Sequence, residues 1–195
     1  MRNIMDIMLI RHAMTAGNLQ RRYVGSSDEG LCPEGIELAE QKAQFLLMPD
    51  LVYTSPMLRC RQTAEILFPG KTPIVIDGLQ ETNFGKFEYK TYEELKDDPD
   101  YIAWLESSGT GEIPGGESLM TVKERVLEGF GKLILDIMLQ DYSEQIALVA
   151  HGGTIMTLLA ALGTPERGYY DWQTKNCCGY VVTPEGEHLR VLREL

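Results

Sequence analysis

Positive charge is the first thing this sequence has little of. Lys and Arg number 18 against 29 Asp and Glu, so the formal net charge is −11. Nucleic acids and anionic membranes attract basic proteins, and this balance argues against either as a partner. An acidic protein that binds an anionic ligand has to concentrate its few cations locally. The arginines in the first third of the chain fit that requirement: Arg11, Arg21, Arg22, Arg59 and Arg61.

Cysteine is also scarce, and its spacing indicates no metal or redox site. Cys32, Cys60, Cys177 and Cys178 form no C-x-x-C pair and match no metal-ligand spacing. We interpret the adjacent Cys177 and Cys178 as small apolar side chains within a strand. Cysteine usage of this kind fits a reducing compartment, so we expect a cytoplasmic protein.

Long apolar runs, repeats, low-complexity tracts and linkers are missing as well. At the amino terminus Arg2 is followed by Asp6, and the apolar stretch there is too short for a signal peptide or a membrane span. A chain of 195 residues with 44% apolar and 24% charged residues is ordinary for one globular domain with a full core. We therefore expect a single domain over residues 1–195.

Histidine is rarer still, yet two of the three histidines directly follow apolar runs. Ile7–Ile10 is followed by Arg11-His12, and Ile146–Ala150 is followed by His151-Gly152. Such runs are typical of buried parallel strands, and ligands bind beyond the carboxyl ends of these strands in open α/β sheets. One Arg-His pair alone is more often a solvated edge or a cap. A second histidine at a strand end favours a binding site for an anion.

The rest of the chain alternates between strands and helices. Further strands are expected at 51–54, 74–76, 178–183 and 188–192, the last exposing His188, and helices at 33–48, 57–68, 91–97, 100–106, 118–139 and 154–162. Ser55 is predicted to cap the second helix, with Pro56 as its first residue and Arg59 one turn inside. Residues 17–30 are predicted to form a polar binding loop. The alternation predicts an α/β sandwich whose mostly parallel sheet has an antiparallel edge.

The candidate functional residues come from separate strand-to-helix junctions, so one sheet edge can gather them: Arg11, His12, Arg59, Glu81 and His151, with Thr15 and Asn18 near the first pair. Phosphoryl transfer needs a cationic clamp on the phosphate oxygens, an in-line nucleophile and an acid for the leaving oxygen. Arginine suits the clamp because its planar fork bonds phosphate through two donors. A neutral imidazole can attack phosphorus, and a carboxyl group can protonate the departing oxygen. Glu88 lies near Glu81 in the chain, and either could instead be a solvated loop carboxylate.

These residues lie in segments that resemble the histidine phosphatase superfamily, the phosphoglycerate mutase-like clan. Arg11-His12-Ala13-Met14-Thr15-x-x-Asn18 is similar to the R-H-G-x-T-x-x-N signature of that family. The further matching segments are Gly25-x-x-Asp28-x-x-Leu31, Thr54-Ser55-Pro56-x-x-Arg59-x-x-Gln62-Thr63-Ala64, Glu81-x-x-Phe84-Gly85-x-Phe87-Glu88, Pro114-Gly115-Gly116-Glu117-Ser118 and Val149-x-His151-Gly152-Gly153. Each motif is weak alone, but six in family order over residues 9–153 are specific, whereas the last forty residues add little.

The resemblance implies a role for each matching residue. His12 would be the nucleophile that becomes phosphohistidine, and Glu81 would be the proton donor. The phosphate and substrate contacts would come from Arg11, Arg59, His151, Asn18, Thr15 and Gly152. The implied fold is a three-layer α/β/α sandwich with a small helical cap inserted at about 85–117, and no metal or cofactor is implied.

The sequence also departs from the family pattern. Ala13 stands where Gly is usual, and a positive φ at that position would strain alanine by roughly 1 kcal/mol. Phe87 replaces a usual Trp, Tyr89 a usual Gly and Cys32 a usual Thr. These three changes bear on packing, substrate fit and a helix cap more than on the chemistry.

The sequence therefore predicts a metal-independent phosphatase for a small phosphate monoester, resembling the small bacterial α-ribazole phosphatases. One alternative is a cofactor-dependent phosphoglycerate mutase, although such enzymes typically have a longer insert and a tail, whereas this chain ends at Leu195. Another is a catalytically silent module that binds a phosphorylated ligand, with Ala13 as the only mark in its favour. Whether the protein is a monomer or a homodimer stays open.

Overall fold

A seven-stranded sheet forms the centre of the computed structural model, which describes residues 5–140 and 145–195, so Arg2 lies outside the described residues. The strands are β1 (Asp6–Arg11), β2 (Leu51–Thr54), β3 (Ile74–Val75), β4 (Gln145–Ala150), β5 (Gly163–Thr164), β6 (Gly179–Glu185) and β7 (His188–Glu194). Their order in the sheet is β3-β2-β4-β1-β6-β7-β5. The first four strands in this order are parallel, and β6 and β7 continue the sheet as an antiparallel pair. The predicted mixture of parallel and antiparallel pairing is confirmed.

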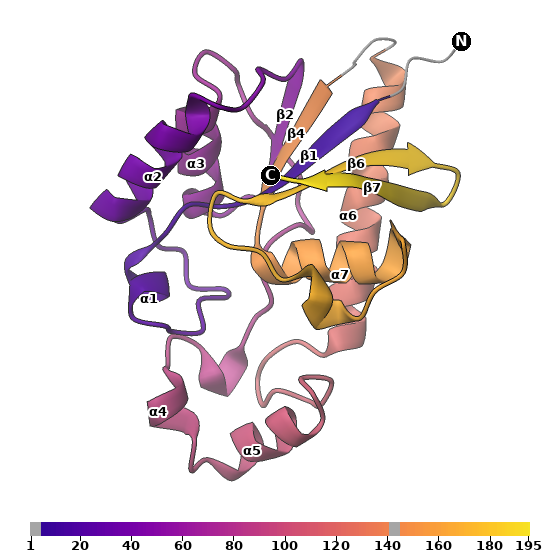
Figure 1. Cartoon of the computed structure of the whole chain (residues 1–195). Coiled ribbons are helices and arrows are strands. Elements are labelled where there is room, and N and C mark those ends of the chain that lie inside the picture. Colours follow the sequence, from indigo (N-terminus) through magenta and orange to yellow (C-terminus); the bar gives the residue numbers. More distant parts are fainter. Residues whose placement is uncertain (1–4, 141–144) are drawn as a thin grey trace.

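Helices cover both faces of this sheet (Figure 1). They are α1 (Ala16–Leu19), α2 (Pro33–Ala43), α3 (Leu58–Leu67), α4 (Tyr92–Leu95), α5 (Pro99–Glu106), α6 (Leu119–Leu139) and α7 (Gly152–Leu162), with 3-10 turns η1 (Gly85–Phe87) and η2 (Tyr169–Trp172). α2 and α3 pack on one face, and α6 and α7 pack on the other (Figure 1). The predicted α/β/α sandwich is therefore confirmed. Within the described ranges, none of the helices combines the length and apolarity that crossing a membrane requires.

The central strand β1 shows why the sequence there reads as a continuous apolar run. Ile7 and Leu9 belong to the core on the α6 and α7 side, whereas Met8 and Ile10 belong to the core on the α2 and α3 side. A strand covered on both faces has no solvent-facing positions, so its apolar residues do not alternate with polar ones. The run ends where the backbone leaves the sheet.

The pairing of β1 with β4 places two of the predicted site residues next to each other. The strands are parallel and aligned so that Arg11 lies opposite Ala150 at their carboxyl ends. The next residues, His12 and His151, therefore leave the sheet at the same edge. The His12 N–H donates to the Ala150 carbonyl at 2.9 Å, which fixes the spacing of the two chains at that point.

A smaller aromatic core lies beyond this edge, where α4 and α5 project (Figure 1). Its buried members and the rings packed against them are Phe87, Leu95, Tyr101, Ile113, Tyr23, Phe84 and Trp104. Tyr23 comes from the first loop, and its hydroxyl is hydrogen-bonded to that of Tyr101 at 2.7 Å. This segment, with η1, α4 and α5, occupies the range in which the cap was predicted.

Some local predictions were wrong. α3 begins at Leu58 with Met57 as its N-cap, so Ser55 is not the cap residue. Cys177 is buried as expected, but it lies before β6 in a turn with a φ of +55° and not in a strand. The first loop is not wholly irregular, because it starts with α1, which Thr15 caps.

Candidate active site

The residues predicted to converge do lie at one sheet edge. Arg11 ends β1 and His12 follows it, Arg59 lies in the first turn of α3 after β2, Glu81 follows β3, and His151 is the N-cap of α7 after β4. The rings of His12 and His151 have centroids 5.2 Å apart and planes inclined at 65°. Four chain segments therefore meet around the two imidazoles.

His12 is held as a neutral imidazole with one free nitrogen. Its Nδ1 lies 2.7 Å from the Ala13 carbonyl oxygen, and because a carbonyl only accepts, the Nδ1 carries the proton. The lone pair is then on Nε2. The side chain is only 3% exposed, and burial, together with the charges of Arg59 and Arg11, holds the pKa of His12 well below its usual value. The ring is therefore neutral at neutral pH, and its Nε2 keeps a lone pair.

Arg59, which is fully buried, and Arg11, which is partly buried, lie beside this ring, and each has an unused donor. Arg11 Nη1 donates to the Thr174 carbonyl at 2.8 Å. Arg59 donates from Nη1 to the Ser27 carbonyl and from Nη2 to the Gly25 carbonyl, both at 2.8 Å. The Nε atoms of both arginines are buried without a hydrogen-bond partner in the described structure. A buried, unpaired donor on a charged group is costly, so the site is built to receive an anion.

His151 is held rigidly at the start of α7. Its Nε2 is 2.7 Å from Ser55 Oγ and 3.4 Å from Cys60 Sγ. The pKa of His151 is also well below its usual value, chiefly because the ring is fully buried, with Arg59 adding to the effect. The helix start is close to a guanidinium, since a Cβ on Gly152 would lie 3.5 Å from Arg11 Nε. Free N–H groups at a helix N-terminus favour negative charge, in line with the two arginines.

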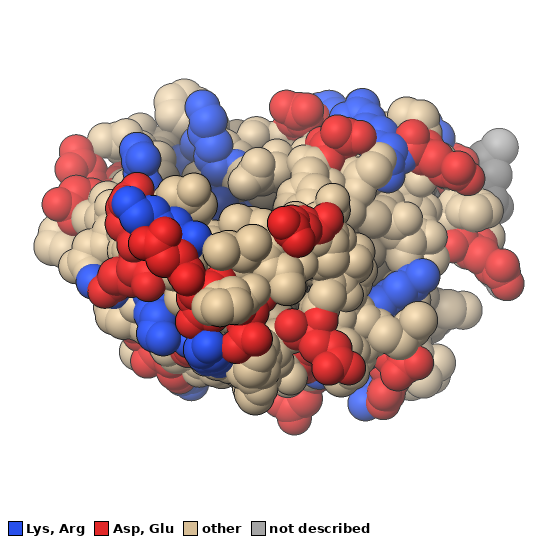
Figure 2. Space-filling view, turned by 90° about the horizontal axis from the view of Figure 1, so that it is seen from below, with Lys and Arg blue, Asp and Glu red and all other residues tan. Residues whose placement is uncertain are grey.

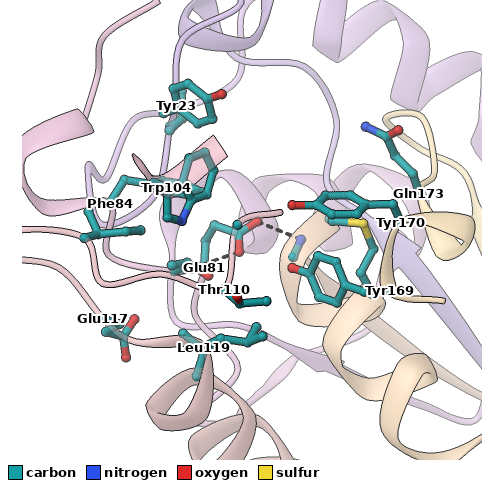
Figure 3. A pocket seen from close by; sticks show the side chains of 18 of the residues that line it. Tyr23, Glu81, Phe84, Trp104, Thr110, Glu117, Leu119, Tyr169, Tyr170 and Gln173 are labelled. Carbon is teal, nitrogen blue, oxygen red and sulfur yellow. Dashed lines mark hydrogen bonds between the residues drawn. The ribbon is translucent and has the colours of Figure 1, made fainter. Parts of the chain in front are cut away.

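Glu81 occupies the opposite side of the site, against the same helix. Its Oε2 accepts from the Gly153 N–H at 3.0 Å and its Oε1 from the Thr82 N–H at 2.9 Å (Figure 3). A Cβ on Gly153 would lie only 2.4 Å from Glu81 Oε1, so the carboxylate rests directly on the glycine. Glu88, the other carboxylate considered from the sequence, is not among the residues that line the cavity described next.

A cavity of about 310 Å³ opens from Arg11, His12 and Glu81. Aromatic rings form part of its walls, and those that line it are Tyr23, Phe84, Trp104, Tyr169 and Tyr170. In Figure 3, Trp104 and Phe84 stand on one side of Glu81 and the two tyrosines on the other. Tyr170 Oη donates to the Ser108 carbonyl at 3.1 Å, which joins the two walls. The cavity thus has charged residues at one end and a body in which aromatic and aliphatic side chains are mixed with polar ones.

Asn18, Thr15 and Gly152 are placed differently from one another. Asn18 lines the cavity, and its Oδ1 accepts from Asn176 Nδ2 at 3.3 Å. Thr15 is fully buried and is the N-cap of α1, accepting from the Asn18 N–H at 3.2 Å, and it is not among the cavity-lining residues. Gly152 lines the cavity beside Arg11.

Sequence reasoning missed several residues of this site. Arg22 and Tyr23 were predicted only as members of the polar loop 17–30 and not as site residues, but both line the cavity. The last forty residues contribute the Thr174 carbonyl to Arg11 and Asn176 Nδ2 to the His12 carbonyl, the latter at 2.9 Å. A backbone carbonyl carries no residue-type signal, so no motif could have identified the first of these contacts.

Ala13 fits the site without strain. Among the described non-glycine residues, positive φ angles occur at Arg21, Tyr89, Ser108 and Cys177 and not at Ala13. The Ala13 N–H donates to Thr63 Oγ1 at 2.9 Å, and the residue is fully buried. The replacement of the usual glycine therefore removes neither a backbone conformation nor a functional group.

The face of the molecule around α4 and α5 carries no continuous basic patch (Figure 2). Figure 2 views the molecule from below, on the side of α4 and α5, and shows acidic and basic side chains interspersed without a continuous basic patch. The positive charge near the two histidines is local and comes from Arg11, Arg59 and the N-terminus of α7.

Comparisons with known proteins agree with this arrangement. The chain is 31% identical to the uncharacterized phosphatase PhoE of Bacillus subtilis, over 82% of this chain and 79% of that protein. It is 29% identical to a 2,3-bisphosphoglycerate-dependent phosphoglycerate mutase of Parvibaculum lavamentivorans, over 80% and 79% of the two chains. The crystal structure of the α-ribazole phosphatase of Shigella flexneri has the same fold, with a TM-score of 0.81 over 98% of this chain and 96% of that one, at 24% identity.

The family model agrees over nearly the whole chain. It is described as the histidine phosphatase superfamily (branch 1), and it matches residues 7–194, from β1 to β7. The match includes every segment that supplies a residue to the site. The chain therefore belongs to the histidine phosphatase superfamily.

Proposed function

We propose that this protein is a metal-independent phosphatase that hydrolyses a small phosphate monoester through a phosphohistidine on His12. The observation that carries the proposal is a neutral, buried imidazole whose free Nε2 lies among guanidinium groups with unused donors. Membership of the family supports a phosphatase or a mutase, and both kinds occur among the relatives.

In the first step, the phosphate dianion binds between Arg11, Arg59 and the start of α7. His12 Nε2 attacks phosphorus, the P–N bond forms, and the bond from phosphorus to the ester oxygen breaks. Glu81 gives a proton to the departing oxygen, which leaves as the alcohol.

In the second step, water replaces the alcohol beside phosphohistidine. Glu81, now a carboxylate, removes a proton from the water as its oxygen attacks phosphorus, and the P–N bond breaks. The electron pair of that bond returns to His12 Nε2. Inorganic phosphate then leaves, Glu81 has regained its proton, and the imidazole is neutral again.

The cavity beyond the phosphate site favours an uncharged alcohol. Arg22 is the cation that lines this part, but it is paired with Glu94 at 3.0 Å, donates to the Tyr89 carbonyl and lies over the Tyr89 ring. Its charge is therefore largely compensated, and the remaining walls include five aromatic rings beside aliphatic and polar side chains. Flat, weakly polar groups bind well against such rings. This supports α-ribazole phosphate as the first candidate substrate.

A phosphoglycerate mutase is the second candidate, and the 29% identity to the Parvibaculum lavamentivorans enzyme favours it. Phosphoglycerate carries a carboxylate besides its phosphate, and a site for it needs a further unpaired cation. Arg22 is already paired, which supports the phosphatase over the mutase.

A release assay separates these functions. Inorganic phosphate is measured with an aryl phosphate, sugar phosphates, nucleotides, phosphoglycerates and α-ribazole phosphate, each with and without EDTA, and with His12→Ala as the blank. The proposal expects turnover that survives EDTA and is lost in the variant. Interconversion of phosphoglycerates that depends on bisphosphoglycerate would instead identify a mutase, and no turnover of any ester would identify a binding module.

A further inference from the structure

The carboxylate of Glu88 accepts hydrogen bonds from three backbone N–H groups, and two of them belong to the loop that contacts Arg59. Glu88 Oε1 accepts from the Gly25 N–H at 2.8 Å and from the Ser27 N–H at 3.0 Å. Glu88 Oε2 accepts from the Phe84 N–H at 3.1 Å. Hydrogen bonds to a carboxylate are stronger than those between neutral groups, so one side chain ties the loop to the segment that begins the cap.

The same loop residues hold Arg59 through their carbonyl groups. Arg59 donates to the Gly25 and Ser27 carbonyls, both at 2.8 Å, and no other hydrogen-bond acceptor of its guanidinium is recorded in the described structure. Each of these two residues thus accepts from Arg59 on one side and donates to Glu88 on the other. The orientation of the guanidinium therefore depends on a loop conformation that Glu88 sets.

Close packing leaves this loop little freedom to find another conformation. A Cβ on Gly25 would lie 1.9 Å from the Thr82 carbonyl oxygen and 2.8 Å from Glu88 Oε2. Gly25 is therefore pressed against the segment that carries Glu81 and Glu88, and only a residue without a side chain fits there.

We propose that Glu88 is a positioning residue that aims Arg59 at the phosphate. The inference rests on the proposed function, in which Arg59 holds the phosphate oxygens. Glu88 does not line the cavity, and both of its carboxylate oxygens already accept hydrogen bonds from backbone N–H groups. Without the Glu88 carboxylate the loop at Gly25 and Ser27 can change conformation, so the Arg59 guanidinium is oriented less well toward the phosphate. The affinity for phosphate and the catalytic rate then fall together.

The test uses Glu88→Gln, which keeps the shape of the side chain but places an NH₂ group against at least one backbone N–H. We expect inorganic phosphate, measured by calorimetry, to bind about 5- to 20-fold more weakly. We also expect kcat/KM to fall by a similar factor for aryl and alkyl phosphates alike. Glu29→Gln is the matched control, since Glu29 also joins this loop to the cap segment, through the Gly17 N–H and the Tyr89 hydroxyl, but not through Gly25 or Ser27. It should change phosphate affinity less than twofold.

A double-mutant cycle shows whether Glu88 acts through Arg59. In an Arg59→Ala background, Glu88→Gln should change phosphate affinity less than twofold, because the group that it positions is gone. The same loss in both backgrounds would overturn the proposal, as would unchanged affinity in the single variant. A loss confined to alkyl phosphates would also overturn it, since that result would make Glu88 a proton donor. Phosphate binding requires no turnover, so an inactive wild-type protein would refute the proposed function while leaving this test intact.

Discussion

Substitution of Gly153 by alanine should displace Glu81, the proposed proton donor, without disturbing the proposed phosphate-binding arginines. Gly153 lies in the first turn of α7, its N–H donates to Glu81 Oε2, and an added Cβ would meet Glu81 Oε1 at 2.4 Å. The new methyl group meets the end of a side chain and not the backbone, so the carboxylate can move aside. Alanine also favours the helix more than glycine does. The variant should therefore fold.

The size of the effect follows from this distance. Carbon and oxygen atoms that are not bonded need roughly 3.0–3.4 Å, so from the starting 2.4 Å the carboxylate must shift by about 0.6–1.0 Å. A misplacement of about 1 Å can slow a positioned catalytic step by about 10²-fold. An alkyl phosphate, whose alkoxide leaves badly, should lose about that much in kcat. An aryl phosphate needs no acid for its leaving group and should lose less than about fivefold.

The assay compares kcat for one aryl and one alkyl phosphate in wild type and variant. Gly131→Ala is the control, because Gly131 lies in α6 and a Cβ there would meet nothing within 4 Å. That variant should keep the wild-type ratio of the two rates. If Gly153→Ala leaves the ratio of the aryl rate to the alkyl rate unchanged, with or without a loss of both rates, Glu81 is not the proton donor at this position.

Three further results are expected. Arg59→Ala should lower kcat/KM by about 10²–10³-fold, comparable to the loss of one preorganised donor at an oxyanion, and a loss below about fivefold would place Arg59 outside the clamp. Glu81→Gln should reduce alkyl phosphate turnover far more than aryl phosphate turnover, and equal losses would indicate another acid. Because the folded-state pKa values of His12 and His151 lie well below 6.5, the unfolded chain binds up to two more protons at lower pH. The free energy of unfolding, measured with urea, should therefore fall below about pH 6.5, by up to about 2.7 kcal/mol per pH unit for the two histidines, and His151→Ala should reduce that slope.

The ends of the central strands were predictable from the sequence for a physical reason. β1 and β4 are buried on both faces, so both read as continuous apolar runs. The run in β1 stops at Arg11, the last residue of the strand, and the run in β4 stops before His151. Parallel neighbours place such ends at one edge, and their convergence follows from the pairing. The fold class could be predicted for the same reason.

Contacts made far along the chain could not be predicted in this way. Ser55 precedes Pro56, a local pattern typical of a helix start, but its hydroxyl is bonded to His151, 96 residues away. Helix-capping patterns consider only residues near each other in sequence, so they cannot predict a hydrogen bond to His151. Glu81 was the predicted proton donor, but the sequence could not exclude the nearby Glu88, for the same reason. Their hydrogen bonds, to Gly153 and to the loop at Gly25, separate them only in the folded chain.

Locating the transferred phosphoryl group tests the central claim most directly. Wild-type protein is mixed with an aryl phosphate, quenched in base within one turnover, and digested for mass spectrometry, with ³¹P NMR to identify the bonded nitrogen. Since Nδ1 of His12 is held by the Ala13 carbonyl, phosphate should appear on Nε2 of His12, stable to base and lost in acid. Phosphate on another residue, on His12 Nδ1, or on no residue during steady turnover would contradict the mechanism.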